Sequence, residues 1–182
     1  AAGRLGWLPA ANLPAIPSAP PGSFRVVSFA DGDTISVAMN GRIERIRLIG
    51  VDTPETAKNG VVGQCYAQAA AAFTRDQIKA DGSIRLQADP IGDNRDRYGR
   101  LLRYVYLPDG SQLNRRLIEE GYGFAYLFFP FSQSADFAAA QNQARQNGKG
   151  LWSNCRPYQK KGKWQTQIIG TNGALLKTAA IG

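Results

Sequence analysis

The chain has 182 residues, of which 43% are hydrophobic and 20% are charged, so it can form one domain of ordinary size with a buried core. It contains no histidine, which excludes a Ser-His-Asp or Cys-His triad, a histidine zinc site and an imidazole general base. The net charge of +8 is unevenly distributed, because residues 156–182 carry five basic residues and no acidic residue, and the body of the chain is nearly balanced.

Residues 1–22 are rich in proline and alanine and have neither helical nor strand periodicity, so we expect a linker or a processed N-terminal segment there. From residue 23 onward, apolar and polar residues alternate in three runs, which lie at 24–28, 34–39 and 43–49. Asn40-Gly41 separates the second run from the third, and a type I′ hairpin turn needs such residues because they accept positive φ. This pattern predicts a three-stranded meander.

The rest of the chain predicts three helices and two more strands. The helices are expected at 64–80, 113–121 and 137–148, and the strands at 84–88 and 101–107. Five strands with a helix after the third are compatible with an α+β fold, a five-stranded OB-fold barrel with three helices. We expect this domain to span residues 23–155 and to be followed by a basic, flexible tail at residues 156–182. No run of 18 apolar residues occurs, so no membrane span is expected.

Four acidic residues form the densest group of chemically active side chains. Asp31 and Asp33 belong to an Asp-Gly-Asp-Thr sequence, and Asp52 and Glu55 to an Asp-Thr-Pro-Glu sequence. Asp33 begins the second expected strand and Asp52 follows the third, so an antiparallel meander allows their carboxylates to converge. Such a pair repels itself and needs a cation, and hard oxygen ligands suit Ca²⁺ or Mg²⁺ better than zinc. Alternatively, the first sequence forms an ordinary turn and the second caps the following segment.

Arginines complement these acids in two places. Arg45 and Arg47 alternate with apolar residues and so share one face of the third expected strand, and Arg97 and Arg100 precede the fifth. A guanidinium group can hold two phosphate oxygens through paired hydrogen bonds, and it stays charged near neutral pH. The arginines therefore indicate contacts to a phosphodiester. Alternatively, they form a solvated basic edge that prevents strand pairing between molecules.

In order and spacing, these motifs resemble those of the thermonuclease, or staphylococcal-nuclease-like, family. The resemblance runs from about residue 26 to residue 152 and implies an OB barrel with three helices. Its markers are Asp-Gly-Asp-Thr at 31–34, Arg-Leu-Ile-Gly-Val-Asp-Thr-Pro-Glu at 47–55, Tyr-Gly-Arg at 98–100 and Gly-Leu-Trp at 150–152.

The resemblance implies a Ca²⁺ site and a residue that activates water. By this resemblance, Ca²⁺ is bound by the side chains of Asp33 and Asp52 and by the backbone carbonyl of Thr53. Asp31 supports the site from nearby, and Glu55 is the general base or orients the attacking water.

The resemblance also implies how the nucleic acid is held. Arg47 and Arg100 would bind the reacting phosphate. Further nucleotide contacts would come from Arg97, Tyr98 and Tyr126. The family has a second aromatic hydroxyl after the last of these tyrosines, whereas this sequence has Phe128.

The residues and the resemblance together predict a Ca²⁺-dependent phosphodiesterase. It would hydrolyse DNA and RNA with little sequence specificity, leave 3′-phosphate ends and act as a monomer. The alternative is a non-catalytic OB-fold module that binds nucleic acid or serves as a scaffold. Such a module has no evident need for the complete set of acids and arginines.

The chain has two cysteines, Cys65 and Cys155. We expect a disulfide that joins the start of the first helix to the segment after Trp152, and the alternative is two free thiols. A disulfide indicates a secreted, periplasmic or cell-surface protein with bacterial-type export, which agrees with the expected use of Ca²⁺.

Overall fold

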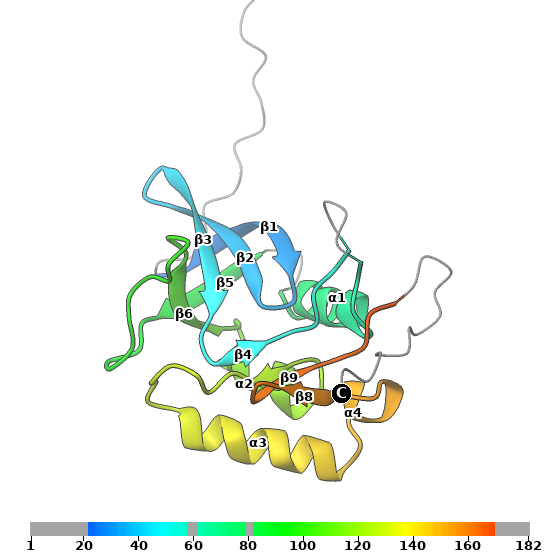
Figure 1. Cartoon of the computed structure of the whole chain (residues 1–182). Coiled ribbons are helices and arrows are strands. Elements are labelled where there is room, and N and C mark those ends of the chain that lie inside the picture. Colours follow the sequence, from blue (N-terminus) through cyan, green and yellow to red (C-terminus); the bar gives the residue numbers. More distant parts are fainter. Residues whose placement is uncertain (1–21, 58–61, 79–81, 170–182) are drawn as a thin grey trace, which may run out of the picture.

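The computed structural model describes residues 22–57, 62–78 and 82–169. Its centre is a closed five-stranded barrel in which neighbouring strands follow the order β1-β2-β3-β6-β5 (Figure 1). All pairs are antiparallel except β3 with β6, which is parallel. The strands are β1 (Phe24–Asp31), β2 (Thr34–Met39), β3 (Arg42–Leu48), β5 (Ser83–Gln87) and β6 (Leu101–Tyr106). The expected α+β fold with an OB-type barrel is confirmed.

Helices and short two-stranded sheets surround the barrel in the described part of the chain. The helices are α1 (Ala67–Gln77), α2 (Leu113–Glu119), α3 (Ser134–Gln146) and α4 (Leu151–Asn154). The first three match the expected helices, whereas α4 has only four residues, too few to show a helical period. The short strands β4 (Val51–Asp52) and β7 (Phe124–Ala125) pair antiparallel. None of the described helices is long and apolar enough to cross a membrane.

Two expectations fall on residues outside the described ranges. The Pro- and Ala-rich segment is expected at residues 1–22, of which 1–21 lie outside, and the first helix is expected at residues 64–80, of which 79 and 80 lie outside.

The β2–β3 hairpin brings the acidic and basic motifs to one end of the barrel. Its turn contains Asn40 and Gly41, whose φ angles of 50° and 75° agree with the expected turn. Ile35 pairs with Ile46 across the hairpin, and both side chains are fully buried. The adjacent pair joins Thr34 to Arg47. Because side chains alternate along a strand, burying the isoleucines turns Arg47 away from the barrel interior.

Asn114 of α2 connects the barrel to the segment that leads into β4. Its side chain is fully buried, its Oδ1 accepts a hydrogen bond from the Val105 amide (2.8 Å), and its Nδ2 donates to the Ile49 carbonyl (2.9 Å). Buried polar groups are costly unless they are paired, so these bonds fix α2 against both partners. They help to determine where β4 begins.

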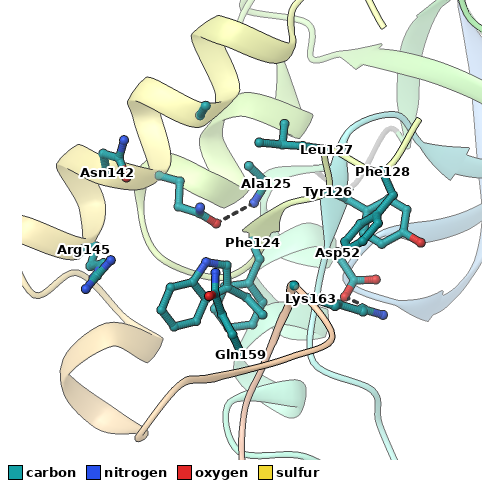
Figure 2. Close-up of a pocket in the computed structure, with 14 residues that line it drawn as sticks. Asp52, Phe124, Ala125, Tyr126, Leu127, Phe128, Asn142, Arg145, Gln159 and Lys163 are labelled. Carbon is teal, nitrogen blue, oxygen red and sulfur yellow. Dashed lines mark hydrogen bonds and ion pairs between the residues drawn. The ribbon is translucent and has the colours of Figure 1, made fainter. Parts of the chain in front are cut away.

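The folded structure continues to residue 169, whereas the sequence predicts a flexible tail from residue 156. Strands β8 (Tyr158–Lys160) and β9 (Lys163–Gln165) pair antiparallel and form what we call the C-terminal hairpin, residues 158–165. The ring centroid of Trp164 lies 6.2 Å from that of Phe124 in a stacked arrangement and 5.0 Å from that of Trp152 in an edge-on arrangement. Figure 2 shows hairpin residues beside Phe124 of β7. This aromatic packing corrects the expected start of the tail; residues 170–182 lie outside the described ranges.

The expected disulfide between Cys65 and Cys155 is present and encloses a segment with a sequence separation of 90 residues. It joins the chain before α1 to the chain before the C-terminal hairpin. Thr166 and Gln167, which follow the hairpin, both bond to Cys65. The Cys65 amide donates a hydrogen bond to the Gln167 carbonyl (2.7 Å), and Thr166 Oγ1 donates one to the Cys65 carbonyl (2.8 Å). The hairpin is therefore attached to the Cys65 region on both sides.

We predict that the double variant Cys65→Ser/Cys155→Ser has a free energy of unfolding about 2–4 kcal/mol lower than the wild type, because a long loop is no longer closed. Urea unfolding of the oxidised wild type and the variant measures this difference, with the reduced wild type as the control. Equal unfolding midpoints would show that the disulfide does not stabilise the fold.

Candidate active site

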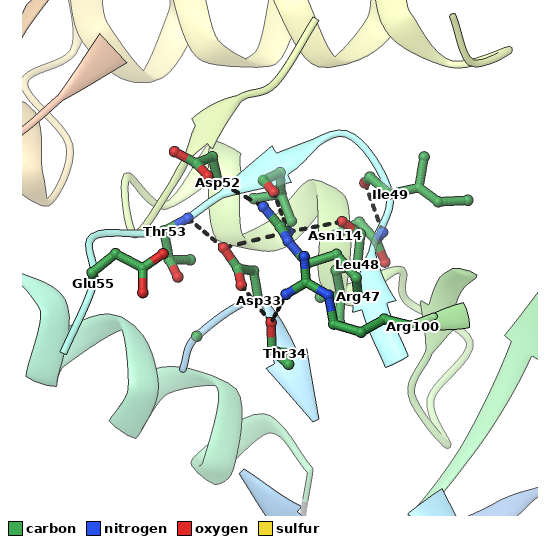
Figure 3. A network of polar contacts seen from close by, with 12 residues as sticks. Asp33, Thr34, Arg47, Leu48, Ile49, Asp52, Thr53, Glu55, Arg100 and Asn114 are labelled. Atoms are coloured by element: carbon green, nitrogen blue, oxygen red, sulfur yellow. Dashed lines mark hydrogen bonds and ion pairs between the residues drawn. The ribbon is translucent and has the colours of Figure 1, made fainter. Parts of the chain in front are cut away.

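Arg47 lies between two carboxylates at one end of the barrel. Its Nη1 is 3.3 Å from Asp33 Oδ2, and its Nη2 is 3.2 Å from Asp52 Oδ1 (Figure 3). Asp33 precedes β2, Arg47 lies near the end of β3, and Asp52 ends β4. The two aspartates therefore converge as the sequence predicts, and a guanidinium group offsets their mutual repulsion.

The backbone that follows β3 fixes the position of this arginine. Arg47 Nη1 donates hydrogen bonds to the carbonyls of Val51 (2.6 Å) and Leu48 (3.1 Å). The chain can curl around the guanidinium because Gly50 adopts a φ of +69°, and a Cβ at this position would lie 2.6 Å from the Phe131 ring. A larger residue at Gly50 would therefore disturb both the turn and the placement of Arg47.

Hydrogen bonds from Thr34, its neighbour in sequence, and from Thr53, on the segment after β4, hold the Asp33 side chain in place. Its side chain is almost completely buried; Oδ1 accepts a hydrogen bond from Thr34 Oγ1 (2.9 Å), and Oδ2 accepts one from the Thr53 amide (2.8 Å). Gly32 permits the close approach, since a Cβ there would lie 2.8 Å from the Thr53 methyl group. Thr53, a predicted metal ligand, is thus fixed directly beside Asp33.

The donor atoms gathered here fit a hard cation. Burial raises the pKa of the Asp52 carboxyl and the nearby Asp33 raises it further, while Arg47 and Lys163 act in the opposite direction. The Thr53 hydroxyl is buried and has no hydrogen-bond partner among the described residues. An oxygen-only set suits Ca²⁺, which accepts carboxylates, carbonyls and water together. Among the described residues, no group of three or more His, Cys, Asp or Glu side chains could hold a metal.

Glu55 lies on the segment that leaves β4, and Asp31, the last residue of β1, contacts this segment. The backbone of Glu55 is anchored by two hydrogen bonds with Gln64, because its amide donates to Oε1 (2.7 Å) and its carbonyl accepts from the Gln64 amide (2.9 Å). The Glu55 side chain is exposed beside Thr53 (Figure 3). Asp31 is buried, and its Oδ1 accepts a hydrogen bond from Thr56 Oγ1 (2.6 Å). Asp31 therefore positions the segment that carries Glu55.

Arg100 approaches the site from the start of β6. Its Nε donates to Asp96 Oδ2 (2.6 Å), and its Nη1 lies 3.4 Å from Thr34 Oγ1. Tyr98 is 65% exposed, and its ring lies beneath two guanidinium groups, with Arg97 at 4.8 Å and Arg100 at 5.4 Å from the ring centroid. The three predicted phosphate- and nucleotide-binding residues of this motif therefore form one continuous basic and aromatic surface.

Tyr126 reaches the same site through β7. Val51 pairs with Ala125, and the Tyr126 amide donates to the Gly50 carbonyl (2.8 Å). The sequence gives no direct sign of this β4–β7 pair because each strand has only two residues.

Comparison with known proteins identifies the family of this chain. The family model described as staphylococcal nuclease homologue matches residues 45–154. Over 134 residues the chain is 37% identical to a thermonuclease from Staphylococcus hyicus. The aligned region covers 72% of this chain and 76% of that protein. The chain belongs to the staphylococcal nuclease family.

Two relatives from Bacillus subtilis are longer than the shared region. The chain is 38% identical over 125 residues to endonuclease YncB and 37% identical over 125 residues to the SPbeta prophage-derived endonuclease YokF. These matches cover 68% of this chain in both cases, but only 58% of YncB and 41% of YokF.

Sequence reasoning misses one residue of the site, Lys163. Its Nζ lies 3.0 Å from Asp52 Oδ2 and 5.4 Å from the centre of the Tyr126 ring. The residue belongs to the C-terminal hairpin, which follows the stretch matched by the staphylococcal nuclease model. The available signal is a Lys-Gly turn, with positive φ at both residues, between Tyr158 and Trp164.

We predict that Arg47→Ala lowers the free energy of unfolding by about 3 kcal/mol in a chelator, because two largely buried carboxylates lose the charge between them. Millimolar Ca²⁺ should restore more stability to this variant than to the wild type, since the ion replaces the missing positive charge. Urea unfolding with and without Ca²⁺ measures both effects.

The matched control is Arg45→Ala, which removes an exposed arginine from the same strand. We expect it to change the free energy of unfolding by less than about 0.5 kcal/mol, as is usual for surface substitutions. Equal effects of the two substitutions would contradict the bridging role of Arg47.

Proposed function

We propose that the chain is a Ca²⁺-dependent nuclease that hydrolyses phosphodiester bonds of DNA and RNA with little sequence specificity and leaves 3′-phosphate ends. The observation that carries this proposal is the guanidinium bridge of Arg47 between Asp33 and Asp52, beside Glu55 and Arg100. The names of the relatives, thermonuclease and endonuclease, support a nuclease. A module that only binds nucleic acid would not require this arrangement.

In this proposal, Asp33, Asp52 and the Thr53 carbonyl hold Ca²⁺. When bound, the ion polarises a phosphate oxygen and makes a coordinated water more acidic. Glu55 is suited to accept the proton of the attacking water because its carboxylate is exposed next to Thr53. Attack forms one P–O bond and breaks the bond to the 5′ oxygen, which leaves as an alcohol after taking a proton from solvent.

The proposed roles of the arginines follow from where negative charge grows during hydrolysis. The phosphoryl oxygens gain charge in the transition state, and a donor that is already oriented stabilises them without further reorganisation. Asp96 orients Arg100 at Nε, and backbone carbonyls orient Arg47. Arg97, Tyr98 and Tyr126 are proposed to contact neighbouring nucleotides.

The disulfide supports the proposal that the protein acts outside the reducing cytosol, as a secreted, periplasmic or cell-surface enzyme. Ca²⁺ is abundant in such places, so a site with only two carboxylates can function there. We further propose that the enzyme acts as a monomer.

We predict that cleavage of DNA and of RNA by the full chain needs Ca²⁺, with half-maximal activity at about 0.1–1 mM, the range of extracellular calcium modules. Excess chelator should abolish cleavage, and added Ca²⁺ should restore it. A fluorescence assay on labelled strands measures the rate, and phosphatase treatment of the products identifies the 3′ ends. Full activity in the chelator would contradict the proposal.

We predict that Glu55→Gln and Arg100→Ala each lower kcat on the order of 10²–10³-fold, because one removes the proton acceptor and the other an oriented donor. Thermal unfolding should change little, since Glu55 is exposed and the Arg100–Asp96 ion pair is partly exposed.

Glu120→Gln and Arg42→Ala are the matched controls, because each removes the same kind of group from an exposed position, and Arg42 lies at the hairpin-turn end of β3. We expect both controls to keep wild-type kcat. Loss of folding in Glu55→Gln or Arg100→Ala, rather than loss of rate in a folded protein, would remove the support for the assigned role.

A further inference from the structure

A cavity of about 330 Å³ lies between β7, α3 and the C-terminal hairpin (Figure 2). The Ala125 amide donates to Gln141 Oε1 (2.9 Å), which joins the β7 wall to the α3 wall. The hairpin forms the third wall, so the cavity exists only because the chain continues beyond the region that the family model matches.

The cavity adjoins the candidate active site, because Asp52 belongs to both. The Oδ1 atom of this aspartate faces Arg47, and its Oδ2 atom faces Lys163 at the edge of the cavity. Tyr126 also lines the cavity, with its ring close to the Lys163 ammonium group. Asp52 and Tyr126 therefore connect the lining of the cavity to the candidate active site.

Cationic and aromatic groups line the cavity together. Lys163 and Arg145 lie toward opposite sides of it in Figure 2, and the Arg145 guanidinium is 5.3 Å from the centre of the Trp164 ring. Phe128 lines the cavity and is 53% exposed. Single-stranded nucleic acids are held by such a combination, in which cations contact phosphates and exposed rings stack on bases.

Lys163 is well placed to exchange partners. Its side chain is 44% exposed, and ion pairs with this much solvent contact are weak. The hairpin that carries it is fixed before β8 by the Cys65–Cys155 disulfide and after β9 by the hydrogen bonds of Thr166 and Gln167. The lysine is therefore held beside Asp52 by a rigid support, and its ammonium group can turn from this carboxylate to a phosphate.

We infer that this cavity is a second nucleotide subsite for single strands, in which Lys163 binds the phosphate adjacent to the one that is cleaved. The inference rests on the proposed nuclease function, because it takes a polynucleotide as the ligand. It adds a positioning residue from outside the matched family region and predicts that longer strands bind more tightly than those too short to reach the cavity.

Binding of oligothymidylates to the full chain in a chelator tests the subsite without cleavage. The probes are a dinucleotide and a hexanucleotide, and calorimetry measures their dissociation constants. We expect the wild type to bind the hexanucleotide more tightly. Ala138→Phe places a ring in the cavity. We expect it to weaken hexanucleotide binding about tenfold, which is the effect of losing one stacked base. Dinucleotide binding should change less than about twofold.

Ala139→Phe is the steric control, because this residue is exposed on the same helix and does not line the cavity. Lys163→Ala should also weaken hexanucleotide binding about tenfold through the lost phosphate contact, with a smaller effect from Lys160→Ala. Lys160 pairs with Lys163 across the hairpin, so both substitutions remove one charge from the same element. Thermal unfolding identifies any variant that fails to fold, and either cavity variant alone suffices for the test.

Wild-type affinity for the hexanucleotide in a folded Ala138→Phe or Lys163→Ala variant would overturn the subsite, as would no binding of the hexanucleotide to the wild type. Tighter binding by Lys163→Ala would also overturn it, since the lysine would then only cover Asp52. Cleavage by the wild type with Ca²⁺ is measured separately. If cleavage occurs and the length effect does not, only the subsite fails; if the length effect occurs without cleavage, only the proposed hydrolysis fails.

Discussion

Two ionised carboxylates can share one small volume of a protein only if positive charge lies between them or beside them. In this chain Arg47 meets that requirement for Asp33 and Asp52, and much of the local structure serves to hold these three groups in place. The register of the β2–β3 hairpin places Arg47 opposite Thr34, and the turn at Gly50 brings backbone carbonyls to its guanidinium group. The same charge requirement supports the proposal that a cation binds at these carboxylates.

The C-terminal hairpin extends this electrostatic arrangement. Lys163 adds a second positive group to Asp52 from an element that is distant in sequence, and the Cys65–Cys155 disulfide ties this element to the start of α1. A disulfide and an aromatic cluster thus do more than stabilise the fold, because they place a charged side chain at the edge of the site. The hairpin also closes a cavity that the barrel and helices alone do not enclose.

Most of the barrel and much of the site could be predicted from local patterns. Alternating apolar residues and the Asn40-Gly41 turn determine the meander, and the meander brings Asp33 and Asp52 together. The sequence could not reveal the β4–β7 pair, the four-residue helix α4 or the hairpin, because each is short and depends on contacts with distant segments. The sequence pattern places Lys163 in a flexible tail for the same reason, because its contact with Asp52 depends on where Trp164 and the disulfide place the hairpin.

The central claim is that Asp33 and Asp52 form a cation site whose charge Arg47 balances. Calorimetric titration of Ca²⁺ into the wild-type chain, Asp33→Asn and Asp52→Asn tests it most directly, with Asp93→Asn, at an exposed position, as the control. The account predicts one Ca²⁺ per chain in the wild type and in the control, and at least a tenfold weaker affinity in each of the other two variants. Equal affinity in all four proteins would contradict it.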